Sequence, residues 1–216
     1  MEQGVFLERL RLFDAGDREI EGPFRETELW SPDGKRLTVW FHPGRQKQGV
    51  NLNEDEGPVL LPNGTYRLVI NGSWRSTAGI ALGEDVRIAF ATTEPDHEPP
   101  DISSIEMTIP ESGSRRPLVA RFPEALDTAM LATALQVRRG KSILPGSGSV
   151  NASGTEWSFV PDHPWSTTTC HLGIAPNLED LAGNSFLGPF EVDLQATRHP
   201  AVENIDLPFL PKTKRP

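Results

Sequence analysis

The segment TCHLGI at residues 169–174 carries apolar side chains at every second position, and the segment TYRLVI at residues 65–70 has a similar alternation. An apolar period of two residues is typical of a β-strand with one buried face. The two segments lie 104 residues apart, and at this separation the similarity continues without a gap from residues 65–90 to residues 169–194. The sequence therefore predicts two copies of one module.

The similarity extends upstream of these segments with small shifts. Residues 37–43 resemble residues 155–161, since both segments end in F-x-P, and residues 1–12 resemble residues 126–137. In the second copy, Asp127 is a good helix N-cap that precedes a run of helix-forming residues. We therefore expect one or two helical turns between the strands of this copy.

A proline-rich connector, residues 94–101, separates the two copies. We expect a first domain at residues 1–97, a second domain at residues 98–196 and a C-terminal extension at residues 197–216 with a strand at residues 202–209. Seven or so short strands in about 100 residues predict an all-β fold of two tandem immunoglobulin-like β-sandwiches.

The second copy contains a strand-like segment, residues 117–122, that has no counterpart in the first copy. A sandwich without this strand has an unpaired edge and an uncovered strip of core. The sequence thus predicts that the first sandwich lacks its first strand, and that the native gene product extends upstream of Met1 to supply it. The alternative is that another segment, residues 202–209, fills the gap.

Bulk composition argues against several classes of function. Twenty prolines and nineteen glycines among 216 residues favour turns over long helices. The formal charge of −9 argues against a nucleic-acid partner. No run of about 18 apolar residues occurs, so direct membrane insertion is not expected. The single cysteine, Cys170, excludes an internal disulfide and lies in an apolar alternation typical of a buried side chain. We expect a monomer.

Three motifs of the second copy resemble the bacterial SbsA-type Ig-like domain family. They are FPEALD at residues 122–127, FVPDHPW at residues 159–165 and DLAGN at residues 180–184. The resemblance implies an Ig-like sandwich and export to the cell envelope of a bacterium, where such modules occur in surface-layer, adhesive and uncharacterised proteins. The charged N-terminus MEQGVFLERL shows no export signal. The first copy departs from the family pattern at residues 77–80, where it lacks both the aspartate and the asparagine.

The motif NLEDLAGN at residues 177–184 has two interpretations. In a tight turn, Gly183 would supply a positive φ, and the side chains of Asp180 and Asn184 would bind nearby backbone groups. In a calcium site, six to eight oxygens are required, and Glu179, Asp180 and Asn184 supply only part of that set. The first copy makes the equivalent turn without these residues, which favours the turn. No other metal site and no cofactor are predicted.

The insertion at residues 44–62 distinguishes the first copy from the second. A long loop without periodicity is often functional. Its charges, first basic and then acidic, predict a dipolar surface for a protein or envelope partner, made by Arg45, Lys47, Glu54, Asp55 and Glu56. We expect that alanine at the two basic positions reduces partner binding without lowering the melting temperature.

Motifs of enzymes are not found in the sequence. It has no G-x-S-x-G and no glycine-rich phosphate loop, and its five histidines lack the short spacings of zinc sites. Five tryptophans suggest a carbohydrate platform, but Trp40, Trp74 and Trp157 fall at positions of the repeat that we expect to be core or half-buried. The sequence predicts a non-catalytic spacer or protein-interaction module. The alternative is an accessory protein that binds carbohydrate or calcium through loops at the ends of the sandwiches.

Overall fold

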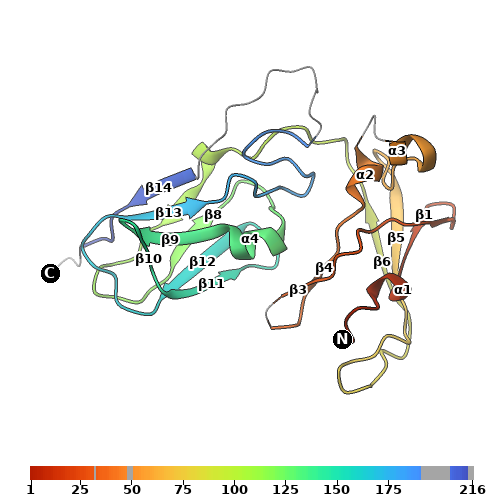
Figure 1. The fold of residues 1–216 in the computed structure, drawn as a ribbon, viewed down its shortest axis with the longest axis horizontal. Coiled ribbons are helices and arrows are strands. Elements are labelled where there is room, and N and C mark those ends of the chain that lie inside the picture. The colour runs from red at the N-terminus through yellow and green to blue at the C-terminus, as the bar shows by residue number, and fades with distance from the viewer. Residues whose placement is uncertain (32, 48–50, 191–204, 214–216) are drawn as a thin grey trace. The chain divides into compact units, whose positions relative to one another are not determined.

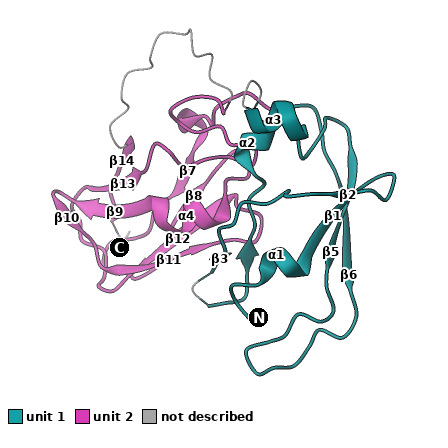
Figure 2. Ribbon diagram, turned by 45° about the vertical axis from the view of Figure 1, so that its right-hand side comes forward, with its two compact units in different colours: residues 1–95 teal, residues 96–216 magenta. Residues whose placement is uncertain are grey.

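The computed structural model describes residues 1–31, 33–47, 51–190 and 205–213. The chain divides into two compact units, Met1–Pro95 and Asp96–Pro216, which are described separately (Figure 2). Most of the regular structure consists of strands in antiparallel sheets, so the predicted all-β class is confirmed. Among the described residues, the helices are too short or too polar to cross a membrane.

Unit 1 contains a four-stranded sheet of order β2-β1-β5-β6 and a separate ribbon of β3 and β4 (Figure 1). Its elements are α1 (Phe6–Arg9), β1 (Leu10–Asp14), β2 (Glu19–Ile20), β3 (Leu29–Trp30), β4 (Leu37–Thr38), α2 (Pro43–Gln46), α3 (Asn51–Glu56), β5 (Thr65–Ile70) and β6 (Val86–Ala91).

The core of unit 1 lies on one face of this sheet. Leu10 and Leu12 of β1 stand directly opposite Ile70 and Leu68 of β5, and opposite residues of an antiparallel pair share a face. The buried residues of this core are Phe6, Leu10, Leu12, Phe24, Val59, Tyr66 and Trp74. The alternation of TYRLVI thus sets which face of β5 is buried.

Unit 2 has two four-stranded sheets, of order β10-β9-β13-β14 and β11-β12-β8-β7 (Figure 1). Its elements are η1 (Ile102–Ser104), β7 (Glu106–Thr108), β8 (Leu118–Arg121), α4 (Thr128–Ala134), β9 (Leu135–Arg139), β10 (Ser142–Ile143), β11 (Gly146–Val150), β12 (Glu156–Pro161), β13 (Cys170–Ile174) and β14 (Ile205–Phe209).

Both sheets of unit 2 contribute to one hydrophobic core. Cys170, Leu172 and Ile174 of β13 are buried, and so are Trp157 and Phe159 of β12. These are the alternating positions that the sequence predicted to be buried.

The predicted helical turns of the second copy are present as α4. The Asp127 carboxylate accepts hydrogen bonds from the backbone N–H groups of Ala129 and Met130, both at 2.8 Å, and so satisfies two donors at the helix start. Leu131 is buried and anchors the helix on the core. The same succession of helix and strand occurs in unit 1, where Phe6 of α1 is buried ahead of β1.

The C-terminal strand corrects one expectation. β14 pairs with β13 on the side opposite β9. Residues 191–194, at the end of the predicted repeat, lie outside the described residues. β14 also lies in unit 2, so the idea that residues 202–209 fill a gap in the first copy is wrong.

Candidate functional site

The DLAGN part of the NLEDLAGN motif forms the tight turn that the sequence favoured. Gly183 has φ of 89°, a conformation that residues with a Cβ rarely adopt. The Asp180 Oδ1 atom accepts hydrogen bonds from the backbone N–H groups of Ala182 at 2.8 Å and Asn184 at 2.9 Å. A carboxylate that accepts hydrogen bonds from its own loop in this way stabilises the turn.

The side chain of Asn184 is fully buried and joins three segments of unit 2. Its Nδ2 donates to Asp180 Oδ2 at 2.9 Å and to the carbonyl of Asp96 at 3.2 Å. Its Oδ1 accepts from the N–H of Phe190 at 2.9 Å. The amide oxygen is therefore already engaged by a backbone donor, and the amide nitrogen, which cannot bind a cation, faces Asp180.

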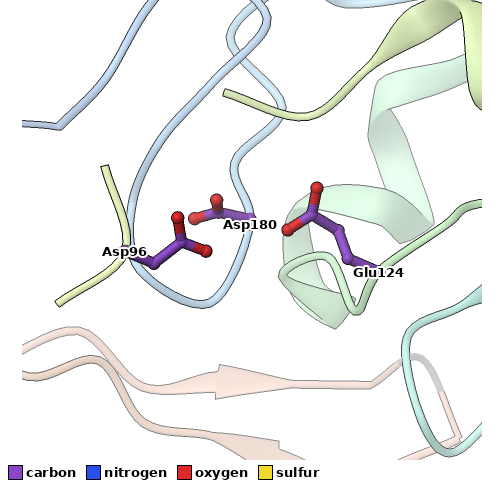
Figure 3. A group of neighbouring side chains, drawn as sticks. All are labelled: Asp96, Glu124 and Asp180. Atoms are coloured by element: carbon purple, nitrogen blue, oxygen red, sulfur yellow. The ribbon is translucent and has the colours of Figure 1, made fainter. Parts of the chain in front are cut away.

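Three carboxylates lie close together at this turn. Side-chain oxygens of Asp96, Glu124 and Asp180 lie within 4.8 Å of one another, and the carboxylate of Asp180 lies between the other two (Figure 3). Asp180 is buried, Glu124 is half-buried and Asp96 is exposed. We refer to these three residues as the acidic cluster.

Backbone contacts bring the acidic cluster together. Leu126 and Asp180 form an antiparallel bridge, and the N–H of Asp127 donates to the carbonyl of Glu179 at 2.8 Å. These bonds hold the turn between β8 and α4, which carries Glu124, against the loop that follows β13. The Asn184 amide ties the segment of Asp96 to the same loop.

Burial and nearby negative charges disfavour the ionised form of Glu124 within the acidic cluster. Loss of hydration on burial raises the pKa of Glu124 above its usual range, and the negative charges of Asp180, Asp96 and Glu98 raise it further. Carboxylate oxygens are the ligands that calcium and magnesium prefer. Three carboxylates supply only part of a calcium shell, because Asp180 already accepts three hydrogen bonds within the protein.

Replacing Glu124 by glutamine is expected to raise the melting temperature of unit 2 at pH 7 by a few degrees. Because the folded state raises the pKa of this carboxyl, its contribution to stability decreases as the pH rises through that pKa. The gain should therefore vanish below about pH 4, where glutamate is protonated in both states. Scanning calorimetry of both proteins at pH 7 and at a pH below about 4 measures the effect. Glu106→Gln, at an exposed position of β7, is the matched control, and an equal gain at both pH values would contradict the electrostatic cause.

The acidic cluster overlaps only partly with the calcium candidates from the sequence. Asp180 belongs to it, whereas Asn184 presents its amide nitrogen to Asp180 and Glu179 lies outside the three. Sequence reasoning missed Asp96 and Glu124. The signals for them were an acidic residue in the proline-rich connector and the glutamate of FPEALD, but only the fold shows that these segments meet.

The insertion at residues 44–62 differs from the expected long loop, because it contains α3 and all but the first residue of α2. Arg45 is only 5% exposed, so it does not belong to a contact surface. Its guanidinium donates to the carbonyl of Gly57 at 3.0 Å, to that of Glu56 at 3.2 Å and to that of Glu21. Arg45 thus anchors the insertion to the rest of unit 1, and the expectation that its loss leaves stability unchanged must be corrected.

The other charged residues of the insertion lie nearer the surface. Lys47 directly follows α2 and is half-buried. Glu54, Asp55 and Glu56 are exposed on α3, and Glu56 places a carboxylate oxygen 3.7 Å from Arg45 Nε. The structure leaves an acidic rather than a dipolar face on this helix.

Other reactive or aromatic side chains are buried or half-buried. Burial raises the pKa of the Cys170 thiol, which disfavours the reactive thiolate. Trp74, Trp157 and Trp165 are buried, and Trp30 and Trp40 are half-buried, with Arg25 lying over the Trp40 ring. The three buried indoles cannot offer the open face that a sugar platform needs.

Comparisons of the chain with family models and with curated proteins do not identify a family. No family model matches the chain, and no curated protein matches it. What fold and site together define is an all-β protein of two compact units, with an acidic cluster in the second.

Proposed function

We propose that the chain is a tandem pair of immunoglobulin-like β-sandwiches, the first lacking one strand, that serves as a non-catalytic spacer or protein-interaction module of an exported bacterial protein. The observation that carries this proposal is how the buried polar side chains are used. Arg45, Asp180 and Asn184 are the buried polar or charged residues among those described, and each binds backbone groups that hold loops together. Such groups stabilise a framework and leave little free for catalysis.

The similarity of the two units supports a tandem arrangement. In unit 1, Tyr66, Leu68 and Ile70 of β5 face Phe90, Ile88 and Val86 of β6. In unit 2, the matching residues Cys170, Leu172 and Ile174 of β13 face Phe209, Leu207 and Ile205 of β14. The remaining strands of the two sheets also occupy corresponding positions. β1 and then β2 lie on the other side of β5, as β9 and then β10 lie on the other side of β13.

Export and a place in the cell envelope rest on the resemblance to SbsA-type domains. The motifs that carry it now have physical roles: Asp127 of FPEALD caps α4, and Asp180 and Asn184 of DLAGN close the turn after β13. These roles are structural, which fits a module whose motifs preserve a scaffold rather than a reaction.

Stretching single molecules from their two ends is expected to give two separate unfolding events. A spacer of two sandwiches unfolds unit by unit, since each unit has its own core. The gains in contour length should be about 30 nm for residues 1–95 and about 40 nm for residues 96–216. One event with the summed length would contradict the tandem spacer.

A second candidate function is accessory binding of calcium, which the acidic cluster favours. Bound cation would neutralise the charges that raise the pKa of Glu124 and would stabilise unit 2 by mass action. In this case millimolar calcium raises the melting temperature of the wild type more than that of Glu124→Gln, whereas Glu106→Gln responds like the wild type. Equal responses of all three proteins exclude this candidate.

A further inference from the structure

A strip of apolar side chains on the core-facing side of unit 1 is open to solvent. Val86 and Ile88 of β6 are 43% and 46% exposed. They stand opposite Ile70 and Leu68 of β5, which in turn stand opposite Leu10 and Leu12 of the core. Val86 and Ile88 therefore point to the side that carries the core of unit 1, on β6, which is the edge strand of the sheet among the described residues.

The corresponding positions of unit 2 are covered. Ile205 and Phe209 of β14 are only 8% and 3% exposed. They share a core with Leu118 and Ala120 of β8, from the opposite sheet. Lys212, just after β14, exchanges backbone hydrogen bonds of 2.8–2.9 Å with Ser112 and Pro110, which follow β7. The β7–β8 side of the second sheet thus lies over β14.

Unit 1 has no strands corresponding to β7 and β8 among its described residues. The segment around β4 is paired on one side only, where Arg25 N–H donates to the carbonyl of Trp40 at 2.8 Å and His42 N–H donates to that of Pro23 at 2.9 Å. Backbone groups alternate in direction along a strand, so those of Val39 and Phe41 point to the other side. Within the described residues, no hydrogen bond reaches the N–H or carbonyl of either residue.

In unit 2, the equivalent side of β12 binds β8. Trp157 and Phe159, which correspond in sequence to Val39 and Phe41, pair with Ala120 and Leu118. The side chains of Leu118 and Ala120 are completely buried. β8 of unit 2 therefore shows where a strand would lie in unit 1 if it paired with Val39 and Phe41 and covered β6.

We propose that unit 1 binds an extended segment of a partner polypeptide as an added β-strand, which pairs with Val39–Phe41 and covers Val86 and Ile88. This segment has apolar residues at alternate positions, as β8 does, and no net negative charge, because the chain carries −9. The proposal rests on the interaction role proposed above and specifies its site. A second copy joined edge to edge through β6 fits less well, since such pairing extends the sheet but leaves its face uncovered.

The probe is a fluorescein-labelled peptide with the sequence SRRPLVARFP of residues 114–123, titrated with the whole chain and followed by anisotropy. We expect saturable binding that Ile88→Lys weakens at least about tenfold, since it places a charge under the added strand. Ile143→Lys is the matched control, because Ile143 is 63% exposed on the edge strand β10 of unit 2. A peptide with Leu118→Asp and Ala120→Asp should not bind.

Linking the same peptide covalently to the chain allows strand binding to be tested even if the free peptide binds weakly. Fused to Met1 through a glycine–serine linker, the strand acts at an effective concentration of about millimolar. Amide hydrogen exchange of Val39 and Phe41 should then slow at least about tenfold, and Ile88→Lys should reverse this protection. Unchanged exchange in the fusion, or equal peptide binding by wild type and Ile88→Lys, overturns the proposal.

The remaining outcomes are also decisive. Dimerisation of the wild type in sedimentation experiments that Ile88→Lys abolishes would assign the strip to a second copy and overturn the partner segment. Loss of strand binding would leave the two stretching events of the proposed spacer unaffected. Conversely, a single stretching event together with strand binding would contradict the tandem spacer and retain the acceptor site.

Discussion

Replacing Arg45 by alanine is expected to lower the free energy of unfolding of unit 1 by about 2–4 kcal/mol. The guanidinium binds the carbonyls of Gly57, Glu56 and Glu21, and the residue is almost fully buried. Alanine leaves these acceptors without their donor and opens a cavity between the insertion and the rest of the unit. The contact with the Glu56 carboxylate adds little, because that side chain is half exposed at 3.7 Å.

Urea unfolding of unit 1 measures this loss. Lys35→Ala removes a positive charge from an exposed position of the same unit and should change the free energy by no more than about 0.5 kcal/mol. Arg45→Lys should fall between the two, since an ammonium group cannot reach three carbonyls in the geometry of the guanidinium fork. An Arg45→Ala protein as stable as the wild type would show that the insertion does not depend on this anchor.

Replacing Asn184 by alanine is expected to destabilise unit 2 by about 2–4 kcal/mol. The side chain is fully buried and makes three hydrogen bonds, to Asp180, Asp96 and Phe190. Its removal leaves the Asp180 Oδ2 atom and the N–H of Phe190 without this partner, and it releases the segment of Asp96 from the loop. Asn177→Ala, at an exposed position at the start of the same motif, should cost about 0.5 kcal/mol or less.

The variant Asn184→Asp separates lost hydrogen bonds from charge. It nearly preserves the volume but sets a fourth carboxylate beside the acidic cluster. Like charges disfavour ionisation, so the destabilisation should grow as the pH rises from 4 to 7, whereas that of Asn184→Ala should change much less. Equal pH profiles of the two variants in calorimetry would show that the cluster exerts no electrostatic effect at this position.

The sequence alone determined the local features of this protein. Alternation in TCHLGI identified the buried face of β13, and the buried Cys170, Leu172 and Ile174 agree with it. Asp127 was identified as the cap of α4, and Gly183 as the positive φ of the turn, because each depends on backbone geometry within a few residues.

The neighbours of these elements could be decided only by the tertiary structure. β14 pairs with β13 across 30 or more residues, Arg45 turns inward to carbonyls of distant residues, and Asp96 and Glu124 meet Asp180 from separate loops. A periodic pattern specifies which face of a strand is buried, but it carries no information on which edge the next strand joins. Charged residues are ambiguous for the same reason, since their exposure depends on the acceptors that the fold brings to them.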